Sequence, residues 1–155
     1  QSGSKAVLIF LGSGDPAMER QLAEIAERFD NFLFLRGYAE SLSHLLYKAG
    51  DLFLMPSSFE PCGISQMLSM RDGQPCVVHA VGGLRDTVAN GKTGFQFRGR
   101  SQRAQARQFV AAVASALALK QDEPSRWREI CDLAAEQRFT WEDAARQYLV
   151  KLYAN

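Results

Sequence analysis

The chain of 155 residues lacks an excess of charge of either sign, a long apolar run and a close pair of cysteines. Lys and Arg number 18 and Asp and Glu 17, which gives a formal net charge of +1. Nucleic-acid-binding domains usually present a one-sided basic surface, so this balance argues against that class. No stretch reaches the roughly 20 apolar residues that cross a bilayer, and residues 1–5 lack the apolar region of a secretory signal. We therefore expect neither nucleic-acid nor membrane partners.

Cysteine is scarce, and the three residues, Cys62, Cys76 and Cys131, are widely spaced. An odd number without a CxxC pair argues against a disulfide framework and against a zinc site. We expect a cytoplasmic protein without a bound metal. A length of 155 residues suits one core of ordinary size, so we expect a single domain over residues 1–155.

Short apolar runs alternate with helical stretches along the chain. The first run, residues 5–11, is continuous and stops at Gly12, which is typical of a strand buried on both faces. The later runs occupy residues 32–35, 51–55, 76–80 and 95–97. This alternation predicts an α/β fold, a doubly wound, Rossmann-like parallel sheet flanked by helices, with sites outside the carboxyl ends of the strands.

Helical stripes fill the stretches between these runs and continue to the C-terminus. Asp15 and Thr140 are typical helix caps, and Pro61 with Gly63 predicts the opening of a further helix. From residue 102 onward we expect a helical C-terminal segment. The apolar positions expected to face a core are Met18, Leu22, Ile25, Ala26, Phe29, Ile64, Met67, Leu68, Phe109, Val110, Val113, Leu117, Trp127, Ile130, Leu133, Ala134, Ala144, Tyr148, Leu149 and Leu152.

Two glycine-bearing segments stand at strand-to-helix junctions. One is Phe59-Glu60-Pro61-Cys62-Gly63-Ile64, and the other begins about twenty residues later at Gly82-Gly83. Backbone N–H groups at such junctions point outward and can hold an anion or a sugar hydroxyl. Two neighbouring junctions of this kind predict a nucleotide-sugar pocket.

Several motifs in a fixed order carry a family resemblance. They are residues 11–15 (LGSGD), 57–63 (SSFEPCG), 70–73 (MRDG), 78–88 (VHAVGGLRDTV) and 139–142 (FTWE). In this combination the chain, from about residue 5 to residue 153, closely resembles the C-terminal, nucleotide-binding domain of bacterial glycogen synthases and plant starch synthases.

The resemblance implies a retaining glycosyltransferase of the two-lobed GT-B type, with the donor-nucleotide lobe represented here. That family moves glucose from ADP-glucose, or in some members UDP-glucose, to the non-reducing end of an α-1,4-glucan without a metal. An N-terminal lobe supplies the acceptor groove. The chain begins after the strand and loop that supply the family's basic pair on the diphosphate, so we expect it to be inactive alone and to self-associate weakly through an exposed lobe face.

The resemblance also assigns roles to individual residues. Tyr38 matches the aromatic that stacks on the nucleotide base, with Gly37 beside it, and Glu60 matches the carboxylate of the sugar site and is the candidate catalytic group. The amides of Cys62, Gly63 and Ile64 match those that hold glucose hydroxyls. The remaining nucleotide-binding candidates are Ser65 at the phosphate-contacting helix turn and the glycines Gly12, Gly82 and Gly83.

Two positions depart from the wider family pattern. Leu68 stands where many retaining GT-B enzymes carry a second glutamate, as is usual in the glycogen-synthase branch. Ser58 replaces a common arginine. A glycosidase would need a second carboxylate close to Glu60, and the sequence offers no persuasive partner.

Other interpretations of the same residues stay open at this point. The chain could be a retaining GT-B enzyme that uses UDP-glucose and a small acceptor, or a nucleotide-binding module without turnover. Glu60 could serve only the helix dipole, and a packing role is favoured for Cys62 and His44, while His79 fits either packing or chemistry. Aromatics expected in the core or against the absent lobe are Trp127, Trp141, Tyr148 and Tyr153.

Overall fold

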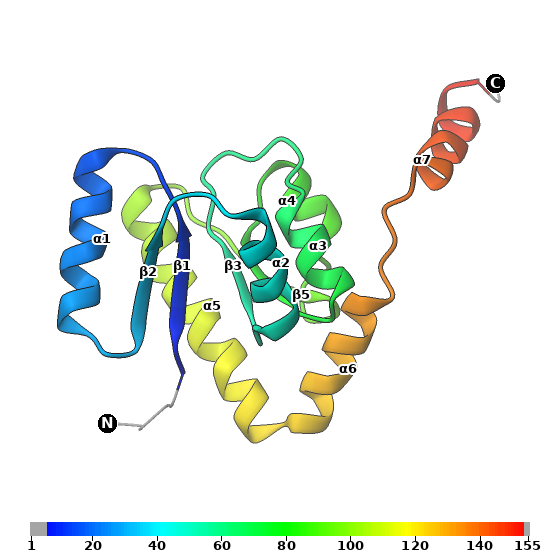
Figure 1. Cartoon of the computed structure of the whole chain (residues 1–155). Helices are drawn as coiled ribbons and strands as arrows, with labels where there is room; N and C mark the ends of the chain where they lie inside the picture. Colours follow the sequence, from blue (N-terminus) through cyan, green and yellow to red (C-terminus); the bar gives the residue numbers. More distant parts are fainter. Residues whose placement is uncertain (1–5, 154–155) are drawn as a thin grey trace. The chain divides into compact units, whose positions relative to one another are not determined.

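The computed structural model describes residues 6–153, in which strands and helices alternate (Figure 1). The strands are β1 (Leu8–Gly12), β2 (Phe32–Arg36), β3 (Phe53–Met55), β4 (Cys76–His79) and β5 (Gly94–Phe97). The helices are α1 (Pro16–Arg28), α2 (Glu40–Ala49), α3 (Ser65–Arg71), α4 (Gly82–Thr87), α5 (Gln102–Asp122), α6 (Pro124–Ala135), α7 (Trp141–Tyr148) and the π-helical turn η1 (Leu149–Tyr153).

Every strand pairing is parallel, which confirms the predicted class of parallel α/β fold flanked by helices. The strands divide between a two-stranded sheet, in the order β1-β2, and a three-stranded sheet, in the order β3-β4-β5. The chain likewise divides into two compact units, residues 1–45 and 46–155. The expectation of one domain stays a prediction.

Unit 1 contains β1, α1 and β2. The strands pair with Leu8 opposite Phe32 and Gly12 opposite Arg36. Helix α1 begins where the sequence predicts, because Oδ1 of Asp15 accepts hydrogen bonds from the first-turn amides.

The apolar side chains of β1 are not buried. Leu8, Ile9 and Phe10 remain 47%, 40% and 45% exposed, so the expected burial on both faces is wrong. Met18 and Ile25 of the expected α1 stripe are exposed too, as is Phe29 directly after the helix. A two-stranded sheet with one helix offers too little surface to cover them, and an apolar groove of about 400 Å³ remains in this unit, lined by Leu8, Phe10, Leu22, Ile25, Phe29, Asn31 and Phe32.

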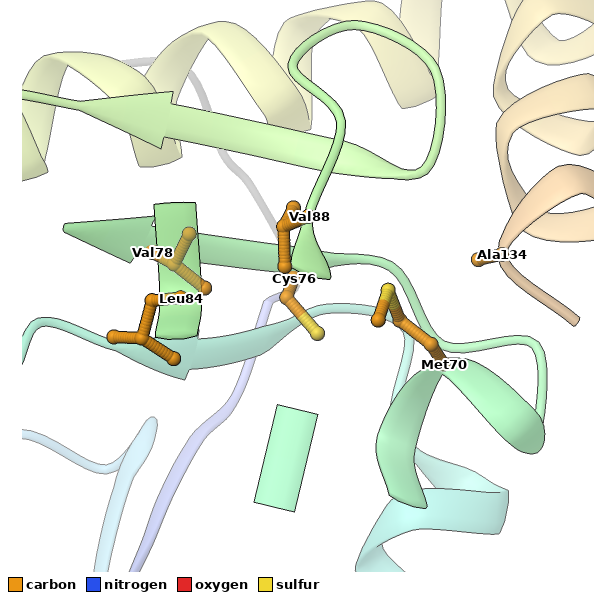
Figure 2. Close-up of a cluster of buried hydrophobic side chains, with 6 residues drawn as sticks. All are labelled: Met70, Cys76, Val78, Leu84, Val88 and Ala134. Carbon is orange, nitrogen blue, oxygen red and sulfur yellow. The ribbon is translucent and has the colours of Figure 1, made fainter. Parts of the chain in front are cut away.

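Unit 2 is built around β4, whose four residues, Cys76–His79, are all buried between β3 and β5. Successive side chains of a strand point to opposite faces, so β4 supplies two cores. On one face Cys76 and Val78 pack with residues of α3, α4 and α6, in the cluster Met70, Cys76, Val78, Leu84, Val88 and Ala134 (Figure 2). On the other face Val77 packs with Phe97, Ala116 and Trp127.

The helices of unit 2 follow the predicted stripes in part. Trp127, Ile130 and Ala134 are buried as expected, whereas Val110 and Ile64 are exposed. Ile64 is 67% exposed because α3 begins at Ser65, after the predicted opening at Pro61, which leaves Ile64 at the helix start.

The C-terminal elements carry the predicted cap and an exposed apolar surface. Thr140 accepts a hydrogen bond from the amide of Asp143 and so caps α7. The final stripe is not buried as expected: α7 continues directly into η1, Ala144 is half-buried, and Tyr148, Leu149 and Leu152 stay exposed. Over the described residues, no helix is both long and apolar enough to span a membrane.

Candidate functional site

The two glycine-bearing segments meet at one edge of the three-stranded sheet. Residues 56–64 follow β3 and lead into α3, and residues 80–81 follow β4 and lead into α4. Because β3 and β4 are adjacent and parallel, their carboxyl ends share an edge. The amide of Gly83 donates to the carbonyl of Glu60 at 3.2 Å, so the two segments are in direct backbone contact.

This contact depends on the absence of side chains at Gly82 and Gly83. A Cβ atom on Gly82 would overlap the carbonyl oxygen of Glu60, and one on Gly83 would overlap the carbonyl oxygen of Cys62. The glycine pair therefore allows the backbone of α4 to lie against the loop that carries Glu60.

Glu60 lies at the centre of this loop and is half-buried. Within the described part of the chain its carboxylate has no hydrogen-bond or ion-pair partner, while its backbone carbonyl is held by Gly83. No other described side chain therefore pairs with the carboxylate, and its oxygens can contact a ligand.

The residues after Glu60 present backbone rather than reactive side chains. Cys62 is exposed rather than packed in the core, and its Sγ lies 3.6 Å from the carbonyl oxygen of Gly63. Gly63 is buried, Ile64 is the N-cap of α3, and Ser65 is its first residue.

Within residues 6–153, the two helices that begin at this edge lack a side-chain cap, as α6 does. Side chains cap α1, α5 and α7, through Asp15, Ser101 and Thr140. No side chain of the described residues caps α3 or α4. The starts of α3 and α4 therefore keep N–H groups that no capping side chain accepts.

The other candidates, Gly12, Gly37 and Tyr38, lie in unit 1. The amide of Gly37 donates to the carbonyl of Gly12 at 3.0 Å, so the ends of β1 and β2 meet. Tyr38 is 83% exposed and presents its ring to solvent.

The turn after Gly12 has its own acceptors. Oε1 of Glu19 accepts from the amide of Gly14 at 2.9 Å, and Oε2 pairs with Arg36 at 2.6 Å. Glu19 and Asp15 thus occupy the N–H groups of Gly14, Ala17 and Met18, and the nucleotide-binding role of Gly12 stays a prediction.

His79 is buried and has a packing role. Its Nδ1 lies 3.0 Å from the carbonyl oxygen of Ser57, and its ring stacks on Phe97 with centroids 5.0 Å apart. A carbonyl only accepts, so Nδ1 carries the proton and donates. His79 thus anchors the start of the loop, and Ser58 adds a second anchor through a 2.9 Å hydrogen bond from its hydroxyl to Gln105.

The sequence reasoning missed Gln66 and Thr87 as parts of this site. Gln66 is buried in α3 and hydrogen-bonds to Cys62, Gly63 and Thr87. A glutamine in the first turn of a helix gives no hydropathy signal. Its one sequence clue is its place directly after the SSFEPCG motif.

Among the described residues, potential metal ligands do not cluster, and two of the three thiols have a perturbed pKa. In residues 6–153, no group of three or more His, Cys, Asp or Glu side chains could hold a metal ion. Burial raises the pKa of the Cys76 thiol to about 12, which keeps it protonated and inert, and burial also raises the pKa of Cys131.

A separate groove of about 650 Å³ lies beside this edge. Cys62 and Met67 line it together with residues of the segment 138–152. Glu60, Gly82 and Gly83 are not among its lining residues, so it gives no measure of the candidate site.

Comparison with known proteins decides the family. The model of the family described as glycosyl transferases group 1 matches residues 1–131. The chain belongs to the glycosyl transferases group 1 family.

Glycogen synthases are among the relatives of this group 1 family member. It is 38% identical over 156 residues to glycogen synthase of Rhodopirellula baltica, covering 94% of this chain and 30% of that protein. It is 42% identical over 149 residues to glycogen synthase of Paracidovorax citrulli, covering 92% of this chain and 28% of the relative. The chain thus spans about 30% of the length of these relatives.

The fold agrees with a solved starch synthase. The catalytic domain of starch synthase IV from Arabidopsis thaliana, bound to ADP and acarbose, aligns with a TM-score of 0.80 and 31% identity, covering 92% of this chain and 31% of that one. The expected resemblance to glycogen and starch synthases, and to one lobe of a GT-B glycosyltransferase, is confirmed.

Proposed function

We propose that this chain is the donor-binding part of a retaining glucosyltransferase of the glycogen and starch synthase type. Its donor is ADP-glucose, and the glucose passes to the non-reducing end of an α-1,4-glucan. The observation that carries the proposal is the backbone contact between Gly83 and Glu60, which joins two uncapped helix starts at one sheet edge. Membership of the family and the similarity to glycogen synthases support the reaction class.

The loop after β3 receives the sugar in this proposal. Glu60 orients glucose hydroxyls and stabilises positive charge on the sugar, and its uncommitted carboxylate suits that role. The amides of Cys62, Gly63 and Ile64 hold further hydroxyls. Ser65 contacts the phosphates, together with the amides near Gly82 and Gly83.

The nucleotide base stacks on Tyr38 in this proposal. The exposed ring of Tyr38 suits that role, and the bond between Gly37 and Gly12 brings the ends of β2 and β1 together beside it. Stacking tolerates either base, so Tyr38 does not by itself select ADP over UDP. The structure of starch synthase IV, which is bound to ADP, supports the choice of ADP-glucose as the donor.

Glucose transfer needs more stabilisation of the transition state than the helix starts of this chain supply. Breaking the bond between glucose and phosphate leaves negative charge on the diphosphate. A helix start contributes about 0.3–1 kcal/mol when exposed and up to about 2 kcal/mol when partly buried, whereas a million-fold acceleration needs about 8 kcal/mol. We therefore expect the 155 residues to bind the donor without transferring glucose.

The proposal includes neither a metal nor a cofactor beside the donor. The acceptor glucan binds through the part of the protein that the relatives have outside this chain. The three free cysteines suit a reducing compartment, and we place the protein in the cytoplasm.

Calorimetric titration with ADP, UDP and their glucose conjugates tests the donor assignment. We expect a preference for ADP over UDP, with dissociation constants in the micromolar to millimolar range, about −8 to −4 kcal/mol. Tyr38→Ala should weaken ADP and ADP-glucose alike, by about tenfold for one lost stacking contact. Glu60→Gln should weaken the binding of ADP-glucose and leave the binding of ADP unchanged.

The other outcomes separate the alternatives. A preference for UDP would favour a UDP-glucose enzyme with another acceptor. Binding without transfer, in a protein that also contains the remaining length of the relatives, would favour a non-catalytic module. The absence of binding to all four ligands would contradict the donor site, and glucan elongation by the purified chain would contradict its expected inactivity.

A further inference from the structure

Gln66 is a fully buried polar residue whose side chain lies directly behind the candidate sugar loop. It occupies the first turn of α3 and has no exposed surface. Its Nε2 lies 3.2 Å from the carbonyl oxygen of Cys62, 2.9 Å from that of Gly63 and 3.2 Å from Oγ1 of Thr87.

These hydrogen bonds belong to a network that connects the loop with α4. The hydroxyl of Thr87 donates to the carbonyl of Gly83 at 2.7 Å, so it accepts from Gln66. The amide of Gly83 donates in turn to the carbonyl of Glu60, the residue of the loop proposed to contact the sugar. The loop and α4 are therefore tied both through Gln66 and through their backbones.

The chemistry of the partners determines which end of the Gln66 amide faces them. Two carbonyl oxygens and a hydroxyl that already donates can only accept, so the NH₂ group must point toward them. Its Oε1 is buried without a hydrogen-bond partner among the described residues. A carboxylate at this position would place an acceptor against two carbonyls, and a glutamate could not replace the glutamine without loss.

The held carbonyls bear directly on the proposed sugar contacts. A peptide group is planar and trans, so the carbonyl of one residue fixes the direction of the next residue's N–H. Holding the carbonyls of Cys62 and Gly63 therefore fixes the N–H groups of Gly63 and Ile64. Because carbonyl and N–H point in opposite directions, bonds to a buried Gln66 direct these two N–H groups away from it.

We propose that Gln66 is a positioning residue for donor sugar, acting by holding the peptide groups whose N–H atoms bind glucose hydroxyls. This inference rests on the proposed function, because it assigns a supporting residue to the same site. It distinguishes Gln66 from the residues that touch the ligand: loss of Gln66 should affect the sugar and spare the nucleotide.

Gln66→Glu tests this inference through the preference for ADP-glucose over ADP, measured by calorimetry from pH 5 to pH 8. The variant keeps the shape of the side chain and loses the NH₂ donors. At pH 8 we expect the preference to fall by about fivefold or more, as for loss of one buried hydrogen-bonded group. Burial and the facing carbonyls favour the protonated acid, so the preference should approach that of the unmodified chain at the same pH as the pH is lowered, because the protonated carboxyl donates again.

Ser69→Ala is the matched control. Ser69 is buried in the same helix, and its hydroxyl bonds to the carbonyl and side chain of Gln74, away from the loop. This variant should lose stability and keep, at each pH, the preference for ADP-glucose that the unmodified chain shows. Thr87→Val removes the bond from Gln66 and the bond to the carbonyl of Gly83, which leaves the Gln66 amide with its two carbonyl partners alone. It serves if Gln66→Glu does not fold, and should lower the preference by a smaller factor.

The outcomes are distinct. A folded Gln66→Glu that keeps the full preference, or an equal loss in Ser69→Ala, overturns the positioning role. If only Thr87→Val folds, an unchanged preference overturns it. Equal binding of ADP and ADP-glucose by the unmodified chain also overturns it and leaves the nucleotide site intact, whereas binding of neither ligand contradicts the proposed function itself.

Discussion

At the scale of single residues, the glycine pair at the start of α4 decides whether the two loops of the site can touch. A Cβ atom on Gly83 would overlap backbone atoms of Cys62, which cannot turn away as a side chain can. We expect Gly83→Ala to reduce the free energy of unfolding by about 1–3 kcal/mol, the usual cost of overpacking, and to weaken binding of ADP-glucose.

Gly14→Ala provides the control for this prediction. Space is open around Gly14, so a methyl group there should change the free energy of unfolding by less than about 0.5 kcal/mol. Urea denaturation of both variants measures the difference. Equal stability of Gly83→Ala and Gly14→Ala would show that the loops do not need their close contact.

Cys76 makes the stability of the chain sensitive to alkaline pH. Burial raises the pKa of its thiol from 9.0 to about 12 in the folded state. Above pH 9 the unfolded thiol releases its proton while the folded thiol keeps it, so the free energy of unfolding falls as the pH rises toward 12. Between pH 8 and pH 10 the titration of this single thiol should lower the free energy of unfolding by about 1 kcal/mol.

Urea denaturation of the chain and of Cys76→Ala, at pH 8 and pH 10, isolates this contribution. The variant starts from a lower stability because it leaves a cavity, but its decrease with pH should be smaller by about 1 kcal/mol. Identical slopes would mean that the Cys76 thiol is not the group responsible.

At the scale of elements, the same kind of cap has different consequences in α5 and α7. Ser101 caps α5, which packs on β4, β5 and α6, whereas Thr140 caps α7, which continues directly into η1. Loss of either cap should destabilise the capped helix by about 1 kcal/mol. We expect Ser101→Ala to lower the stability of the whole of unit 2, and Thr140→Ala to loosen α7 alone.

Hydrogen exchange distinguishes the two variants. In Thr140→Ala the amides of α7 should exchange about fivefold faster, with β4 unchanged, because a local opening has its own free energy. In Ser101→Ala the slow amides of β4 should exchange faster as well. Faster exchange of β4 in Thr140→Ala would show that α7 is coupled to the core.

At the scale of the whole molecule, apolar side chains remain on the surface at the C-terminus. We call them the C-terminal apolar surface: Trp141, Tyr148, Leu149, Val150, Leu152 and Tyr153, of which Trp141 is 88% exposed. Exposed apolar patches promote association. We expect weak, concentration-dependent self-association of the 155-residue chain, measured by light scattering.

Val150→Lys should reduce this self-association by placing a charge within the surface. Val110→Lys is the control, because Val110 is also an exposed valine but lies on α5, outside the C-terminal apolar surface. A strict monomer at high concentration, or an equal effect of both substitutions, would contradict a role for this surface.

Local features of the chain were readable from sequence because they depend on neighbouring residues. Asp15 and Thr140 cap helices as predicted, since a cap bonds to amides two or three positions away. The short apolar runs became parallel strands for a similar reason. The motif around Glu60 identified the family, since a motif is a property of order and spacing.

Contacts between distant segments were decided only by the tertiary structure. Hydropathy predicted burial for β1, yet Leu8 and Phe10 remain exposed, because burial depends on what covers a strand and not on the strand itself. In the same way, the role of Gln66 follows from Thr87, 21 positions along the chain, and from the carbonyls that the fold places around it. The order of residues thus determined the elements and the family, whereas the packing of remote backbone determined which polar groups meet and which apolar surfaces stay open.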